Sequence, residues 1–110
     1  MTPPRQSSTA SERPEAVLDM IRQCMESAGT DLRGYKIVLF GSRAAGRAGP
    51  RSDFDIGVVG ERPMPLDVFF QIEDKLEALP TLYSIDWVDL SRALPAFREN
   101  ALKEASVIYE

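Results

Sequence analysis

Residues 39–56 (LFGSRAAGRAGPRSDFDI) constrain this chain most, because they join two apolar segments through a connection rich in glycine and arginine. The first apolar segment ends in Gly41 and Ser42, and the second begins with Asp53 and Asp55. An apolar run that stops at Gly-Ser predicts a buried strand followed by a tight turn, and the small residues after it favour a short helix. The stretch therefore predicts strand, turn, short helix and strand, with two aspartates beside the turn.

The hydrophobic pattern predicts further elements on both sides of this stretch. We expect a helix from Pro14 to about residue 28, ended by Gly29, and a strand over 35–40. The remaining expected elements are a strand over 53–59, a helix over 65–79, a strand over 83–89, a helix from Pro95 and a short edge strand over 107–109. In the helix over 65–79, the apolar residues expected to face the core are Leu66, Phe69, Ile72, Leu76 and Leu79. In the helix from Pro95, they are Phe97, Ala101, Leu102 and Ala105. The order α-β-α-β-α-β-α, with a final β, predicts an α/β fold with a small sheet flanked by helices.

Composition narrows the class of protein. A length of 110 residues with 44% hydrophobic residues predicts a single domain; we place it at 13–110, after a mobile tail at 1–12. The formal net charge of −4 argues against direct nucleic-acid binding. No apolar run approaches the roughly 20 residues of a membrane helix, and no signal-peptide core is visible, so we expect no membrane association. Cys24 is the single cysteine, which fits a cytoplasmic protein and a place at the edge of the core.

The chain contains no histidine. This excludes a Ser-His-Asp triad, a Cys-His pair and a histidine-ligated zinc site, so carboxylates, Lys, Tyr or water must carry proton chemistry. In a strand, Asp53 and Asp55 point to one face with Cα atoms about 6.5–7 Å apart, while Phe54 points to the other. Gly57 continues the aspartate face without a side chain, and we expect it to leave room beside the acids.

A third carboxylate is predicted from the strand over 83–89. Asp86 lies between Ile85 and Trp87, which must face away from it, so three carboxylates converge if this strand neighbours the one that carries Asp55. Carboxylates without His or Cys suit Mg²⁺ or Mn²⁺, and two such ions about 3.5–4 Å apart can clamp an in-line phosphoryl displacement. Asp89 is the alternative candidate for the third carboxylate. It lies three residues after Asp86, so the two side chains point to opposite faces of the strand, and we expect Asp89 to be a loop or cap residue.

The Gly-Ser turn predicts a phosphate site. Backbone N–H groups at the start of a short helix, together with the Ser42 hydroxyl, can hold an anion, and glycine at position 41 permits close backbone approach. Arg43, Arg47 and Arg51 lie nearby in sequence and could neutralise the charge of a triphosphate. Each feature alone has an ordinary explanation: Gly-Ser is common in turns, Asp-x-Asp at solvated strand edges, and single arginines on protein surfaces. Their combination at this spacing is specific.

The signature Gly41-Ser42, ten residues, then Asp-x-Asp from Asp53 to Asp55 resembles that of the DNA polymerase beta-like nucleotidyltransferase superfamily. The compact pattern Leu-Phe-Gly-Ser-Arg-Ala-x-Gly…Ser-Asp-x-Asp-Ile resembles the minimal nucleotidyltransferase (MNT) family, and the likeness covers about residues 17–109. The resemblance implies the nucleotidyltransferase fold with a mixed sheet.

The resemblance also implies roles for individual residues. Asp53, Asp55 and Asp86 would bind two Mg²⁺ ions, and Ser42 would hold the terminal phosphates of ATP. The third acid would help to deprotonate or orient an attacking hydroxyl, which strikes the α-phosphate and expels pyrophosphate. The chain departs from the family where Ala45 replaces a frequent arginine, which affects one phosphate or partner contact, and where Gly57 replaces a bulky aliphatic residue.

Several acceptors are compatible with these residues. The resemblance implies an antitoxin that moves AMP from ATP to a tyrosine hydroxyl of a partner HEPN ribonuclease toxin, in a homo- or hetero-oligomer. The alternatives are a small-molecule nucleotidyltransferase of aminoglycoside type, an antitoxin that acts by binding alone, and a nucleic-acid polymerase, which the net charge disfavours. A small cationic acceptor would need an acidic pocket, which we do not expect so short a chain to build alone. Phe70 and Trp87 are apolar candidates for a partner surface, although aromatic residues on periodic elements are mostly buried.

Overall fold

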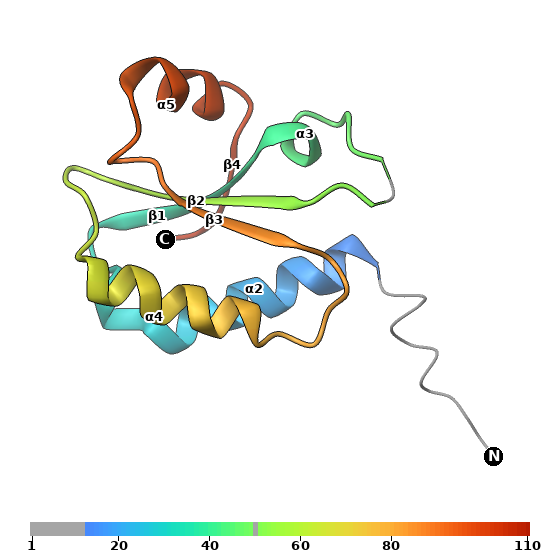
Figure 1. The fold of residues 1–110 in the computed structure, drawn as a ribbon, viewed down its shortest axis with the longest axis horizontal. Helices are drawn as coiled ribbons and strands as arrows, with labels where there is room; N and C mark the ends of the chain where they lie inside the picture. The colour runs from blue at the N-terminus through green and yellow to red at the C-terminus, as the bar shows by residue number, and fades with distance from the viewer. Residues whose placement is uncertain (1–12, 50) are drawn as a thin grey trace.

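The computed structural model describes residues 13–49 and 51–110 as a four-stranded sheet with helices on both faces (Figure 1). The tail predicted over 1–12 lies outside the described residues. In chain order the elements are α2 (Pro14–Ala28), η1 (Gly29–Leu32), β1 (Tyr35–Phe40), α3 (Gly41–Ala44), β2 (Phe54–Gly60), α4 (Leu66–Glu77), β3 (Ile85–Asp89), α5 (Pro95–Leu102) and β4 (Ser106–Tyr109).

The strands lie in the order β3-β2-β1-β4. β1 pairs antiparallel with both β2 and β4, whereas β2 and β3 run parallel. Parallel neighbours need a crossover connection, and α4 supplies it between β2 and β3. The α/β fold with a small mixed sheet flanked by helices is thus confirmed, and β3 lies next to β2 as a convergence of acids from both strands requires.

The main core lies between the sheet and the pair α2 and α4, which cover the same face (Figure 1). Val17, Ile21 and Met25 recur at helical spacing on α2 and are fully buried. Ile37 on β1 and Ile56 on β2 meet them from the sheet. Burial of each such side chain stabilises the fold by about 1.5–3 kcal/mol. Cys24 belongs to this core, as the sequence predicts.

A smaller core covers the other face of the sheet, beneath α5 (Figure 1). Val38, Phe40 and Leu90 are buried there, with Ala101 and Ala105 packed against them. Strand alternation explains the division, because Val38 and Phe40 of β1 point opposite to the residues between them. This second face also carries Asp55 and Asp86, so the smaller core borders the predicted site.

Several strand and helix ends differ from the prediction by one or two residues. β2 begins after Asp53, α4 spans Leu66–Glu77, and β3 begins at Ile85. Differences of this size are usual at element ends, where pairing stops before the apolar pattern does. As a consequence Asp53 belongs to the connection that precedes β2, and its position depends on that connection.

Some apolar residues predicted to be buried are exposed. Leu66, Phe97 and Leu102 expose 53%, 49% and 37% of their surfaces. Leu66 and Phe70 are one turn apart on α4 and line a groove along β3. Since β3 is an edge strand, no further strand of the described chain covers them. α5 is only eight residues long. Ala101 packs against the smaller core and the Phe97 ring meets Phe40, but much of the surface of Phe97 and Leu102 stays exposed.

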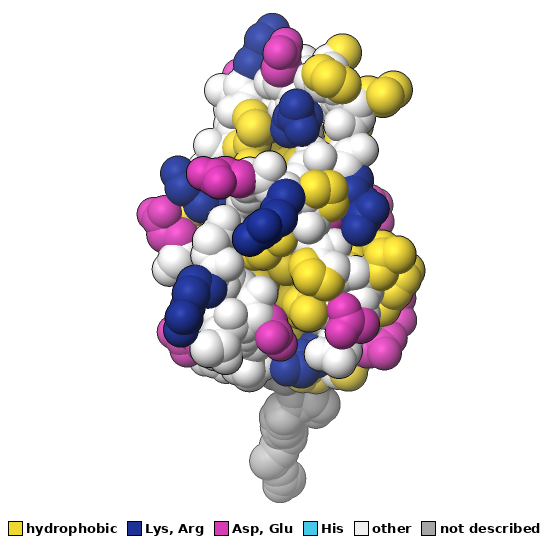
Figure 2. Space-filling model, turned by 90° about the vertical axis from the view of Figure 1, so that its left-hand side faces the viewer, with side chains coloured by type: hydrophobic (Ala, Val, Ile, Leu, Met, Phe, Trp, Pro, Cys, Tyr) yellow, Lys and Arg dark blue, Asp and Glu magenta, His cyan; other side chains and the backbone are white. Residues whose placement is uncertain are grey.

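The two aromatic candidates for a partner surface differ in exposure. Trp87 is buried, stacks on Phe69 with ring centroids 5.3 Å apart, and donates its indole N–H to the Phe69 carbonyl at 3.0 Å. Phe70 is half exposed. Figure 2 shows apolar side chains at the surface of one face, interspersed with Lys, Arg, Asp and Glu. Trp87 therefore belongs to the core, and Phe70 stays a surface candidate.

Candidate active site

The turn after β1 brings the backbone of Gly41 against the carboxylate of Asp55. Gly41 has φ of +75°, a conformation that L side chains rarely adopt. Phe40 and Asp55 are direct partners in the antiparallel register, so the turn lies beside the start of β2. A Cβ at position 41 would collide with Asp55 Oδ2 and lie 3.1 Å from its Cγ. Glycine is therefore required both for the turn and for the close approach to this carboxylate.

Asp55 and Asp86 are cross-strand neighbours. They are partners in the parallel register of β2 and β3, which places their carboxyl groups side by side on one face of the sheet. Burial raises the pKa of Asp55, and the charge and hydrogen bond of Asp86 raise it further, followed by the charge of Asp53. Two like charges side by side repel each other, so a bound cation would favour the ionised form of both carboxylates.

Asp53 lies close to this pair without joining it in direct contact. It is exposed, and it acts on Asp55 through its charge. Within 13–49 and 51–110, no group of three or more His, Cys, Asp or Glu side chains is arranged to hold a metal ion. The structure thus brings Asp55 and Asp86 together, while Asp53 approaches only within electrostatic range.

Phe54 and Gly57 occupy opposite faces of β2. Phe54 points into the main core and is fully buried, as the alternation predicts. Gly57 was expected to leave space beside the acids, and this expectation is wrong. A Cβ at Gly57 would lie 2.6 Å from Leu90 Cδ1 and 3.2 Å from Phe40 Cε1. The missing side chain lets Leu90 pack directly onto the sheet, so the space is filled by the smaller core.

The three arginines predicted to face a triphosphate have different surroundings. Arg43 donates from Nε and Nη2 to the Ser52 carbonyl, at 2.9 and 2.7 Å. Arg47 is exposed and forms an ion pair with Glu104 at 3.3 Å. Arg51 is exposed in the connection before β2. Arg43 is therefore already engaged by the protein, whereas Arg47 and Arg51 are accessible from solvent.

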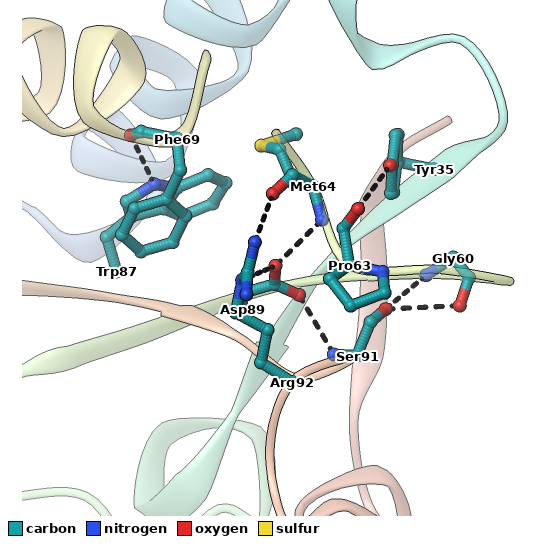
Figure 3. A network of polar contacts seen from close by, with 9 residues as sticks. All are labelled: Tyr35, Gly60, Pro63, Met64, Phe69, Trp87, Asp89, Ser91 and Arg92. Atoms are coloured by element: carbon teal, nitrogen blue, oxygen red, sulfur yellow. Dashed lines mark hydrogen bonds and ion pairs between the residues drawn. The ribbon is translucent and has the colours of Figure 1, made fainter. Parts of the chain in front are cut away.

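Asp89 has a structural position (Figure 3). Its buried carboxylate accepts backbone N–H groups from Met64 and Ser91, both at 2.9 Å, and pairs with Arg92 at 3.4 Å. Arg92 also donates to the Met64 carbonyl. Asp89 is the last residue of β3, not a loop residue, but it does act as the expected cap. Its side chain points away from Asp86, in agreement with the offset of three.

A groove of about 550 Å³ runs from the carboxylate pair over the edge of β3 to α4. Asp55 and Asp86 line it together with Glu73, Glu77 and Phe97. Glu73, Glu77 and Phe97 were not predicted to belong to the site. Glu73 and Glu77 are four residues apart on the polar side of α4, which was the available signal, but their proximity to Asp86 depends on how α4 packs against β3.

A second hollow of about 390 Å³ lies on the other side of Phe40 and Phe97. Gly41 and Arg47 line it, together with Lys103 and Glu104 of the segment after α5. The rings of Phe40 and Phe97 meet edge to face, with centroids 6.3 Å apart. Gly41 therefore faces a hollow whose charged groups are of both signs, whereas the carboxylate pair faces a groove whose charged groups are all acidic.

These features define a nucleotidyltransferase domain, with paired strand-borne aspartates beside a Gly-Ser turn on a mixed sheet. The family model described as "Polymerase beta, Nucleotidyltransferase" matches residues 32–110, and the chain belongs to this family. None of the curated protein sequences compared with the chain matches it significantly.

Solved structures share this fold. A chain of a toxin–antitoxin complex crystallised with AMP-PNP is 22% identical, with a TM-score of 0.61 over 84% of this chain and 72% of that chain. A chain of the tri-AMPylated Shewanella oneidensis HEPN toxin in complex with MNT antitoxin is 20% identical, with a TM-score of 0.55 over 84% and 71%. A protein assigned as a minimal nucleotidyltransferase is 25% identical, with a TM-score of 0.56 over 84% and 92%.

Over the described residues, the chain has no helix with the length and apolar character needed to cross a bilayer.

Proposed function

We propose that the chain transfers AMP from ATP to a hydroxyl acceptor and releases pyrophosphate, with two Mg²⁺ ions, or Mn²⁺ in their place, held by Asp53, Asp55 and Asp86. The observation that carries this proposal is the pairing of Asp55 with Asp86 directly beside Gly41. The donor set fits the ions, because paired carboxylates without His or Cys favour hard divalent cations. When bound, these ions would neutralise the charge that develops on the transferred phosphoryl group.

The protein's own groups then have distinct tasks. The backbone at Gly41 and the hydroxyl of Ser42 bind and orient the β- and γ-phosphates, at the turn where the close approach of the backbone is available. Asp86, exposed at the edge strand, orients the acceptor hydroxyl and takes its proton. The hydroxyl oxygen forms an ester bond to the α-phosphorus, the bond to the β-phosphate breaks, and pyrophosphate leaves.

The acceptor we propose is a tyrosine of a partner HEPN ribonuclease toxin, which the modification silences. The similar structures support this choice, since one is a complex of an AMPylated HEPN toxin with an MNT antitoxin and another was crystallised with AMP-PNP. The half-exposed Phe70 beside the groove offers an apolar contact for such a partner. Because this reaction would consume ATP and act on a ribonuclease, the location that we propose for the protein is the cytoplasm.

Co-expression with a HEPN-type toxin protein tests this proposal. The partner should gain the mass of one or more adenylyl groups, located by peptide mapping to a tyrosine, when ATP and Mg²⁺ are present. The double variant Asp53→Asn, Asp55→Asn should leave the partner unmodified. If that variant still protects cells from the toxin as fully as the wild type does, the chain acts by binding alone and the catalytic proposal fails.

A second candidate function has one observation in its favour. The groove beside Asp86 is lined by Glu73 and Glu77 in addition to the site carboxylates, which gives the acidic surface that a small polycationic acceptor requires. Incubation of the chain with an aminoglycoside, ATP and Mg²⁺, followed by mass spectrometry of the small molecule, decides this question. An adenylylated aminoglycoside would favour this second function over the toxin.

A further inference from the structure

Arg43 makes contacts that do not suit a phosphate ligand. Two nitrogens of its guanidinium donate to the single carbonyl of Ser52, at 2.9 and 2.7 Å. Its Cζ lies 4.3 Å from the centre of the Phe54 ring and 5.0 Å from that of Tyr83. The two rings meet edge to face, with centroids 5.2 Å apart. The side chain is half-buried, and no carboxylate of the described chain forms an ion pair with it.

These contacts link three segments that meet at the site. Arg43 belongs to α3, directly after Ser42 of the predicted phosphate turn. The Ser52 carbonyl belongs to the planar peptide group that also includes the amide nitrogen of Asp53. The guanidinium therefore fixes the orientation of the peptide plane that leads into Asp53. Tyr83 lies in the segment that leads into β3.

Asp53 needs such an anchor more than the other two acids do. Asp55 and Asp86 are held by the ladder between β2 and β3, whereas Asp53 precedes β2 and is exposed. After Asp53, the first hydrogen bond to the segment before β3 is the one that Phe54 N–H donates to the Ser84 carbonyl, at 2.9 Å. Before Asp53, the Ser52 carbonyl is bound by Arg43.

We propose that Arg43 is a positioning residue that holds Asp53 beside Asp55 and Asp86, and that it is not a ligand of the triphosphate. The inference rests on the proposed function only in taking these carboxylates as a divalent-metal site. The planar guanidinium donates twice to one oxygen while its face lies over aromatic rings, and a lysine ammonium cannot do both. A lysine at position 43 would keep the positive charge but not these contacts, so Arg43→Lys distinguishes a positioning role from a role in binding phosphate.

The test compares Arg43→Lys with Arg62→Gln, which removes an exposed arginine in the loop after β2. Mn²⁺ binding to each protein, without nucleotide or acceptor, is measured by electron paramagnetic resonance of free Mn²⁺. We expect Arg43→Lys to weaken Mn²⁺ binding by about tenfold or more, as loss of groups that orient metal ligands does, and Arg62→Gln to leave it unchanged. Circular dichroism and urea midpoints establish that each variant is folded.

A second variant tests the same role without altering Arg43. Tyr83→Leu removes one of the aromatic rings next to the guanidinium and leaves the three acids themselves unchanged. Loss of one cation–π contact should weaken Mn²⁺ binding in the same direction by about two- to fivefold. This variant keeps the inference testable if Arg43→Lys does not fold.

Kinetics separate positioning from phosphate binding. With ATP and the acceptor, a positioning role predicts that Arg43→Lys lowers kcat by about tenfold or more and changes KM for ATP by less than about threefold. Mn²⁺ affinity equal to wild type in both variants overturns the inference, as does a raised KM for ATP with unchanged kcat. A wild-type protein that does not bind Mn²⁺ overturns it too. If wild type binds Mn²⁺ and Arg43→Lys does not, yet no acceptor is modified, the inference stands and the proposed function fails.

Discussion

Substitution of Gly41 by alanine tests how closely the turn approaches the site carboxylate. The new Cβ meets two penalties. At φ of +75° an L side chain costs about 1–2 kcal/mol. The Cβ would also collide with the Asp55 carboxylate, with Cγ at 3.1 Å, and displacement of a packed group costs about 1–3 kcal/mol. The free energy of unfolding should therefore fall by about 2–5 kcal/mol in urea titrations, and Mn²⁺ binding should weaken because Asp55 has moved.

Gly34 provides the matched control for this substitution. Its φ is +88°, and a Cβ there would have nothing within 4 Å. Gly34→Ala should therefore cost only the backbone strain of about 1–2 kcal/mol and leave Mn²⁺ binding unchanged. In an Asp55→Ala background, the cost of Gly41→Ala should fall to the same value, because the colliding carboxylate is gone. If Gly41→Ala costs no more than Gly34→Ala in the wild-type background, the reasoning is refuted.

Two further predictions concern the acids. Burial and the neighbouring charge and hydrogen bond of Asp86 raise the pKa of Asp55. The folded state therefore binds a proton on Asp55 more tightly than the unfolded state does. Without divalent ions, the free energy of unfolding should fall as the pH rises from about 3.9, the pKa of an aspartate in the unfolded chain, through the higher pKa of Asp55 in the folded protein. Urea titrations in a chelator should show this loss of stability, Asp55→Asn should remove it, and added Mg²⁺ should reverse it. Asp89→Ala leaves the backbone N–H groups of Met64 and Ser91 without their acceptor and should cost about 2–4 kcal/mol, while Mn²⁺ binding persists in the folded protein. A stability loss under about 1 kcal/mol would contradict the structural role of Asp89.

The parts of the fold that the sequence predicted are those set by local periodicity. β1 spans the predicted residues, and α2 ends before Gly29 as expected. The prediction that Asp86 and Asp89 face opposite sides of their strand also followed from a local rule, the alternation of side chains along a strand. These features depend on neighbours within a few residues, so a single sequence is sufficient to predict them.

The features that were not predicted correctly depend on packing between segments that are far apart in the sequence. The space beside Gly57 is filled by Leu90, which lies in the connection after β3. The contacts of Arg43 with the rings of Phe54 and Tyr83 were not predicted, because nothing local in the sequence indicates that these rings meet beside it. Leu66 is exposed because the edge position of β3, which periodicity does not predict, leaves that side of α4 uncovered.

The most direct test of the central claim compares ATP labelled at the α-phosphate with ATP labelled at the γ-phosphate. The purified chain is incubated with its partner toxin and Mg²⁺, and the label on the protein acceptor is measured. Nucleotidyl transfer predicts a stable α-label on the acceptor, with the γ-label in released pyrophosphate, and no α-label with Asp55→Asn or Asp86→Asn. Transfer of the γ-label to the acceptor, or α-labelling that survives loss of either aspartate, would contradict the account.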